Sequence, residues 1–320
     1  MEVHCYLSHL RQPVASGLDP TLSAYRVSLE TGDLHMGSIC LCNYHWVYIF
    51  CGRPLGRYAK HMKVYLSELR LCHQDFLLGF MLPDLYLACQ SENSLLISWD
   101  IIQEAESFTY KAAVAKEQNR AYTQLFNAVV LGDDKMMEQT IHSILEREKV
   151  YRRFGGSHMS NHFFTFWDGL ACFALLRKRR NRTYLRLSKD SIKFLTRLAK
   201  GGSVDCVAIL PFFLEAEEAS LRRRSASQRT KEVKALYDKA IYQLDRASFL
   251  HYSAIANERA GNYMYQCNEQ NLGEMYLKKA VVRFHQWGAT VKLAQLEDMY
   301  PFLIQKEEEQ KGLLRSQVGE

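Results

Sequence analysis

Residues 235–301 read ALYDKAIYQLDRASFLHYSAIANERAGNYMYQCNEQNLGEMYLKKAVVRFHQWGATVKLAQLEDMYP, a pattern typical of three or four helices. Gly261 and Gly273 are 12 residues apart, and Gly273 and Ala280 are 7 residues apart. Where two helices cross closely, only a missing or short side chain lets their backbones approach. We therefore expect neighbouring helices to touch at these positions, with Tyr265 and Tyr276 filling the space around them.

A tetratricopeptide-type (TPR) repeat carries small residues at the same two intervals. Tyr237 and Ala240 fit the matching positions of a preceding repeat. Ala240 and Ala280 are 40 residues apart, slightly more than that repeat's period of about 34 residues. The predicted fold class is therefore all-α, a TPR-like α–α superhelix in which antiparallel helix pairs stack as a solenoid.

One string of residues in this stretch resembles a known family. It is similar to the C-terminal part of the helical repeat region in large hybrid signalling proteins. Those proteins join a serine/threonine kinase-like domain, an AAA-type ATPase, the helical array, a GAF domain and a sensor histidine kinase. The resemblance implies a fold and a lineage, and no activity of this stretch itself. The string comprises Ala254–Gly261, Ala280, Phe284, Trp287, Gly288, Ala289, Lys292, Leu296, Glu297, Tyr300 and Pro301.

Two Gly-Asp pairs predict tight turns between helices. Gly32-Asp33 closes an A-Y-x-x-x-L-x-x-G-D phrase that the same family carries, and Gly132-Asp133 repeats the pair 100 residues later. We expect each glycine to adopt a positive φ and each aspartate to cap the next helix. Gly37, five residues after Gly32, is a further expected small-residue contact.

Other family phrases are matched in part. Residues 51–55 resemble a G-x-P-L break, and residues 162–163 with 170–171 resemble an aromatic-rich helix. Residues 205–217 lack the family's N-F and H-K pairs.

The order of helices and breakers divides the chain into segments. Asp19 is expected to cap the first helix, with Pro20 in its first turn. Helices are expected over 24–30, 34–50, 55–80, 104–130, 134–154, 158–178, 183–199 and 204–221, before the stretch quoted above. The segments are an irregular lead-in (1–20), the array (21–301) with a possible sub-boundary near 81–98 and a basic insertion at 222–231, and a charged tail (302–320).

Composition places the chain among globular proteins. Its 320 residues are 48% hydrophobic and 24% charged, so a packed core is expected. The net charge of +6 is too weak to indicate a nucleic-acid-binding protein. Nine scattered cysteines favour reduced thiols. We expect no signal peptide and no transmembrane helix, and hence a cytoplasmic protein.

Motifs of nucleotide-using enzymes are missing from the sequence. It contains no G-x-x-x-x-G-K-[ST] loop, which would cradle phosphates, and no H-R-D or D-F-G kinase motif. No histidine-kinase phosphoacceptor box is recognisable. We predict that the chain is not an enzyme and needs no cofactor.

Possible metal ligands are few. His158 and His162 have the four-residue spacing of zinc ligands on a helix, but no third ligand is near in sequence, so packing is the preferred interpretation. Cys40 and Cys42 point to different faces of their helix, and no metal is expected there. The same holds for His4, Cys5 and His9.

Two basic stretches are open to several interpretations. Arg222–Arg224 precedes Ser225 and Ser227, a pattern typical of substrates of basophilic kinases; the alternative is a solvated insertion. The run Arg177–Arg182 is suited to acidic partners, lipid headgroups or RNA, or is merely a solvated turn.

Three functions remain open from the sequence. The preferred one is a non-catalytic scaffold or regulatory segment in signal transduction, which binds a peptide or helix of a protein partner in a concave groove or contacts adjacent kinase or ATPase modules. The second is a fragment of an ATP-binding kinase whose catalytic domains lie outside this chain. The third is a basic helical protein that binds a membrane surface or RNA.

Overall fold

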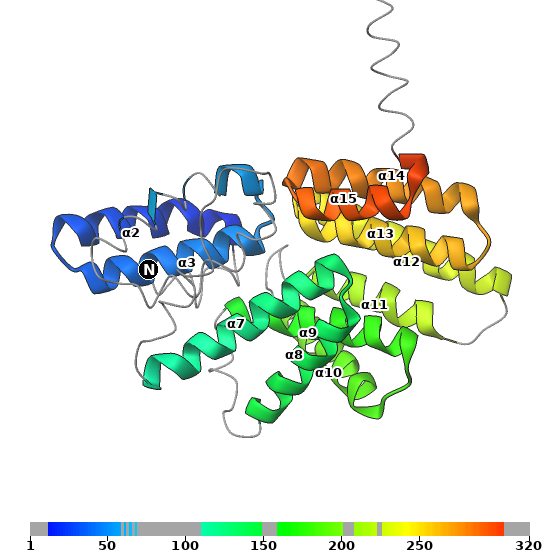
Figure 1. The fold of residues 1–320 in the computed structure, drawn as a ribbon, viewed down its shortest axis with the longest axis horizontal. Coiled ribbons are helices and arrows are strands. Elements are labelled where there is room, and N and C mark those ends of the chain that lie inside the picture. Colours follow the sequence, from blue (N-terminus) through cyan, green and yellow to red (C-terminus); the bar gives the residue numbers. More distant parts are fainter. Residues whose placement is uncertain are drawn as a thin grey trace, which may run out of the picture.

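The protein consists of helices throughout its described part. The computed structural model describes residues 12–58, 61, 64, 65, 68, 110–148, 159–200, 208–222 and 226–303, and no strand occurs in these ranges (Figure 1). The predicted all-α class is confirmed. None of the described helices is both long and apolar enough to cross a membrane.

Consecutive helices pack in pairs. Figure 1 shows three groups: the hairpin α2–α3, the bundle α7–α11 and the layer α12–α15. The pairs are α2 with α3, α7 with α8, α9 with α10, α11 with α12 and α13 with α14. The elements are η2 (Val14–Gly17), α2 (Leu18–Glu30), α3 (Leu34–Phe50), α7 (Tyr110–Leu131), α8 (Asp134–Glu148), α9 (Met159–Lys178), α10 (Arg182–Lys200), α11 (Leu210–Leu221), α12 (Ala226–Arg246), α13 (Leu250–Gln266), α14 (Gln270–Trp287), α15 (Thr290–Met299) and η6 (Pro301–Leu303).

The two predicted Gly-Asp turns are confirmed. Gly32 and Gly132 have φ of 76° and 72°, a region that other residues rarely enter. The Asp33 and Asp133 carboxylates each accept a hydrogen bond from the backbone N–H three residues on, at 3.0 Å and 2.9 Å. Each pair therefore ends one helix and caps the next.

Helix α9 occupies the centre of the bundle. Every residue from Asn161 to Leu175 is buried, and α9 contacts α7, α8, α10 and α11. A helix that is apolar on all sides has no face to present to water. The aromatic run of α9 therefore places it inside, with the other helices around it.

An aromatic cluster joins the three groups of helices. Phe50, at the end of α3, stacks on Phe163 of α9 with ring centroids 4.3 Å apart. Phe126 of α7 stacks on Trp167 at 4.6 Å and meets Trp287 of α14 at 6.1 Å. We call this cluster the aromatic junction; it comprises Phe50, Phe126, Phe163, Trp167, His251, Tyr252 and Trp287.

A buried ion pair attaches α15 to the rest of the fold. The Lys292 ammonium lies 2.7 Å from a Glu258 carboxylate oxygen of α13, and both side chains are at most 10% exposed. Gln295, which accepts a hydrogen bond from Lys292, donates one to the Leu131 carbonyl at 2.8 Å. These polar contacts connect α15 to both α13 and α7.

The small residues of the quoted stretch lie where α13 crosses α14. A Cβ atom on Gly261 would come 2.8 Å from Leu277 Cγ and 3.1 Å from the Gly273 carbonyl oxygen. A Cβ atom on Gly273 would come 2.6 Å from the Tyr265 ring. The two backbones therefore approach as closely as glycine allows.

Gly261→Ala is expected to lower the free energy of unfolding by about 1–3 kcal/mol, because the added methyl meets backbone and a packed leucine. Gly56→Ala is the control, since no atom lies within 4 Å of its added Cβ; it is expected to be neutral or stabilising by up to about 1 kcal/mol. Chemical denaturation followed by circular dichroism measures both. Equal stability of the two variants would contradict a tight crossing.

Three predicted boundaries were wrong. Helix α2 begins at Leu18, so Asp19 lies in its first turn and Gly17 is the N-cap. Residues 208–209 form a turn, and α11 begins only at Leu210. Residues 226–231, expected to be an insertion, belong to α12. Pro211 lies in the first turn of α11, where a proline is tolerated, and it disfavours helix before it. The polar start of α12 has no apolar periodicity of its own, so its extent depends on the anchored turns that follow.

Some predictions concern residues outside the described ranges. These are the possible sub-boundary at 81–98, His4, Cys5, His9, His158, Ser225 and most of the charged tail (304–320).

Candidate functional site

The predicted repeat positions are spread over the fold and do not form one site. Gly32 and Gly132 lie in turns, and Gly37 packs against Ser28 of α2. Ala240, Gly261, Gly273 and Ala280 lie in helix contacts, Trp287 lies in the aromatic junction, and Gly288 ends α14 with φ of 89°.

The candidate metal ligands also lie apart. His162 is fully buried beside the ring of Phe194, Cys40 is buried and Cys42 is partly buried. Among the described residues, no group of three or more histidine, cysteine or acidic side chains is placed to hold a metal ion.

The run Arg177–Arg182 is only in part the solvated turn that was one interpretation of the sequence: residues 178–180 are exposed, but Arg177 is not. Arg177 belongs to α9, and its guanidinium donates to a Glu217 carboxylate oxygen at 2.7 Å and to Ser220 Oγ at 2.8 Å. The Tyr237 hydroxyl donates to the other Glu217 oxygen at 2.6 Å. This network holds α11 and α12 against α9.

Glu217 is fully buried in this network. Burial alone would raise the pKa of its carboxyl, but the charges of Arg177 and Arg259 and the hydrogen bonds outweigh burial and hold the pKa below its usual value. The carboxylate is therefore charged and serves as an internal counterion.

Two further cations of the run pair with α8. Lys178 lies 3.3 Å from an Asp134 carboxylate oxygen, and Arg179 lies 2.6 Å from a Glu138 oxygen. Both pairs are largely exposed and contribute little stability. Three cations of the run are thus paired with carboxylates, and its last residue, Arg182, begins a basic surface that continues along the chain.

That surface is the outer side of α10. The helix buries Tyr184, Ser188, Ser191 and Leu195 against the bundle and exposes six cations on the opposite side. These six residues, which we call the basic face, are Arg182, Arg186, Lys189, Lys193, Arg197 and Lys200.

The basic face follows the helical period. Its members are separated by 4, 3, 4, 4 and 3 residues, so they fall within an arc of roughly 80° at about 100° of rotation per residue. From Arg182 to Lys200 the face extends about 27 Å along the helix axis. Asp190, the one acidic residue of α10, lies at the margin of the arc. Helix α10 therefore carries a net charge of +5, against +6 for the whole chain.

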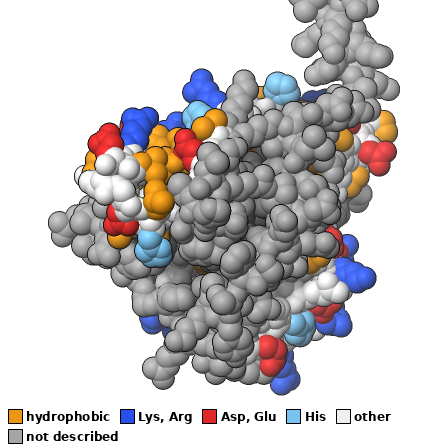
Figure 2. Space-filling model, turned by 60° about the vertical axis from the view of Figure 1, so that its left-hand side comes forward, with side chains coloured by type: hydrophobic (Ala, Val, Ile, Leu, Met, Phe, Trp, Pro, Cys, Tyr) orange, Lys and Arg blue, Asp and Glu red, His pale blue; other side chains and the backbone are white. Residues whose placement is uncertain are grey.

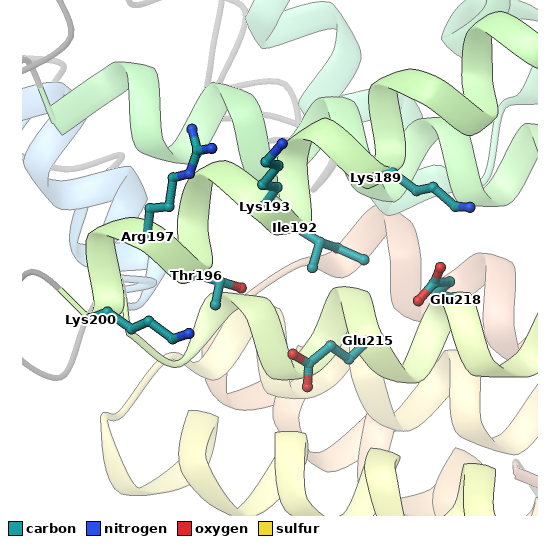
Figure 3. A pocket seen from close by; sticks show the side chains of 8 residues that line it. All are labelled: Lys189, Ile192, Lys193, Thr196, Arg197, Lys200, Glu215 and Glu218. Carbon is teal, nitrogen blue, oxygen red and sulfur yellow. The ribbon is translucent and has the colours of Figure 1, made fainter.

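An open groove of about 480 Å³ lies between α10 and α11. In Figure 3, Ile192 and Thr196 lie between the two helices, with Glu215 and Glu218 on the α11 side. The α10 wall of the groove is thus basic and the α11 wall acidic. The residues that line it are Lys189, Ile192, Lys193, Thr196, Arg197, Lys200, Glu215 and Glu218.

The side chains of the groove are suited to binding charged groups. Its ammonium and guanidinium groups are donors for carboxylates or phosphates.

Another face of the molecule has a different character. Figure 2 brings forward the end that carries α2 and α3, where hydrophobic, acidic and basic side chains are interspersed. Among the described residues in that view, acidic and basic side chains both occur.

Sequence reasoning missed the basic face, although its signal was present. Cations at three- and four-residue spacing, with leucines and aromatics between them, indicate an amphipathic helix. The runs at 177–182 and 222–224 are denser in cations and therefore more prominent in the sequence.

Comparison with protein-family models, with curated proteins and with solved structures found no match to this chain.

Proposed function

We propose that this chain is a non-catalytic helical scaffold that binds an acidic segment of a partner protein through the basic face of α10. The observation that carries the proposal is the set of six exposed cations on one side of the helix. No ion pair joins any of them to a carboxylate of another described residue. Like charges three or four residues apart destabilise a helix by roughly 0.2–0.5 kcal/mol per pair. A bound acidic segment would offset that repulsion.

The proposal extends to architecture and lineage. Pairing of consecutive helices and the tight α13–α14 crossing support a TPR-like superhelix of antiparallel pairs. The resemblance to the arrays of hybrid signalling proteins supports a role in signal transduction, with adjacent kinase or ATPase modules among the candidate partners.

A protein partner is favoured over RNA or an anionic membrane. Glu215 and Glu218 line the wall opposite the basic face. A protein segment can present carboxylates to the basic face and a lysine or arginine to these two glutamates, whereas a phosphate backbone carries negative charge alone. The lining also contains no aromatic ring on which a base would stack.

Three fluorescent probes test this function on the full chain. They are a glutamate-rich peptide, a single-stranded RNA of matched charge and vesicles of phosphatidylcholine with phosphatidylserine. The peptide is expected to bind, with an affinity that falls as salt rises. RNA or vesicles that bind more tightly than the peptide would contradict the proposal.

Reversing three charges of the basic face is expected to remove most of this binding. The triple variant Arg186→Glu, Lys193→Glu and Arg197→Glu should lose at least about tenfold in peptide affinity, because it converts attraction into repulsion. Fluorescence anisotropy measures the loss.

The matched control reverses three exposed lysines on other helices, Lys135, Lys231 and Lys279, so that the net charge changes equally. It is expected to keep nearly the full affinity. An equal loss in both triple variants would show that net charge, and not the basic face, determines binding.

A further inference from the structure

We infer that the groove between α10 and α11 receives an amphipathic α-helix with acidic residues along one flank. Two apolar residues of that helix, about two turns apart, would dock on Leu185 and Ile192. This inference rests on the proposed function and specifies the shape and charge pattern of the partner segment.

Apolar contact area is present beside the basic face. The Leu185 side chain is 43% exposed, and Ile192 is partly buried in the lining of the groove. The two residues are seven apart, so they lie on the same side of α10, about 10.5 Å from each other along its axis. Residues seven apart on a second helix have the same spacing and match them.

The charges on the two walls determine how the bound helix is rotated. Lys193 and Arg197 lie on the α10 wall, and Glu215 and Glu218 lie on the α11 wall. A helix with glutamates toward α10 and lysines toward α11 satisfies both walls. The same helix rotated by half a turn places like charges together on both sides, which disfavours that orientation.

The acidic wall is not fully neutralised by its own helix. Glu218 pairs with Arg222, one turn on, at 2.8 Å. Glu215 makes no ion pair with a described residue. Glu215 is therefore available to pair with a cation of the bound helix. The apolar residues of that helix contact Leu185 and Ile192, and its glutamates contact the basic face.

The length of the face sets the length of the segment. The basic face extends about 27 Å, which corresponds to a helix of roughly 18 residues. An isolated peptide of that length is only marginally helical in water, so the partner segment is expected to gain helicity when it binds.

Two peptides of identical composition test the inference. Both have 18 residues, of which two are leucines, and in both the number of glutamates equals the number of lysines. In the first, the leucines are seven apart, with glutamates on one flank and lysines on the other; in the second the order is scrambled, with the same net charge. The first is expected to bind the full chain about tenfold more tightly and to gain helicity by circular dichroism.

Variants of the apolar pair give the second readout. Two single variants are made, Leu185→Asn and Ile192→Thr. Each is expected to reduce the affinity for the first peptide severalfold and to leave the affinity for the scrambled peptide unchanged. Val282→Asn is the control, because Val282 is also an exposed apolar residue (53%, against 43% for Leu185) but lies on α14. Circular dichroism of each variant verifies that it folds.

The outcomes separate this inference from the proposed function. Equal binding of the two peptides, lost in the charge-reversal variant, overturns the docked helix and leaves the acidic-segment function in place. Binding of neither balanced peptide overturns the docked helix. Failure of the glutamate-rich peptide to bind, or binding of it that the charge reversal does not weaken, overturns the proposed function itself.

Discussion

Replacing Glu217 with alanine is expected to lower the free energy of unfolding by about 3–5 kcal/mol. The substitution leaves the Arg177 guanidinium in a largely buried position, 20% exposed, without its counterion. It also removes the acceptor of the Tyr237 hydroxyl. Because this network joins α9, α11 and α12, its loss is expected to reach the whole bundle. Urea denaturation followed by circular dichroism measures the change.

The neighbouring Glu218 provides the matched control. Its ion pair with Arg222 is partly exposed, with side chains 24% and 47% accessible, so Glu218→Ala is expected to change stability by less than about 1 kcal/mol. A double variant, Arg177→Met with Glu217→Leu, is expected to be more stable than Glu217→Ala because no charge remains buried. A loss below about 1 kcal/mol for Glu217→Ala would contradict the role of the network.

Stability is expected to fall in mild acid because of His251. Its ring lies in the aromatic junction between Phe126 and Trp287 and directly over Gly52. Burial alone lowers the pKa of this imidazole from 6.5 to about 3. The folded protein therefore keeps His251 neutral where the unfolded chain takes up a proton.

The sign and size of this effect follow from proton linkage. Because the pKa is lower in the folded state, the stabilising contribution is complete above pH 6.5 and is lost as pH falls from 6.5 toward 3. The slope approaches about 1.4 kcal/mol per pH unit, so this one group removes about 2 kcal/mol at pH 5. Denaturation curves at pH 7, 6 and 5 measure the change.

Substitution of His251 isolates its part of the pH dependence. His251→Phe and His251→Leu are each expected to show a shallower loss of stability between pH 7 and pH 5 than the unaltered chain, whatever their stability at pH 7. His285→Gln is the control, since His285 is exposed, and it is expected to keep the full slope. An unchanged slope in both His251 variants would exclude this residue as the source.

Local features of the fold were predictable from the sequence. The two Gly-Asp turns need a positive φ and a side-chain acceptor, and both requirements are met by adjacent residues. The close α13–α14 crossing follows from glycines at a regular interval. These features depend on residues within one or two helices, so a single sequence contains their signal.

Contacts between distant residues were not predictable in this way. Phe50 and Phe163 stack although more than 100 residues separate them, and Trp167 donates a hydrogen bond to the Tyr252 hydroxyl at 2.9 Å. The sequence around each of these aromatic residues does not specify which distant residue it contacts. Arg177 shows the same limit, because a cation in a basic run looks solvated until a buried glutamate of another helix is placed beside it.

The most direct test of the basic face is photo-crosslinking in cells that express the chain. A photoreactive amino acid is placed at Lys193, and as a control at Lys231, and the crosslinked molecules are identified by mass spectrometry. We expect position 193 to capture an acidic peptide segment of a partner protein, and position 231 not to capture it. Crosslinks from position 193 to RNA or lipid, or the same products from both positions, would contradict a protein-binding basic face on α10.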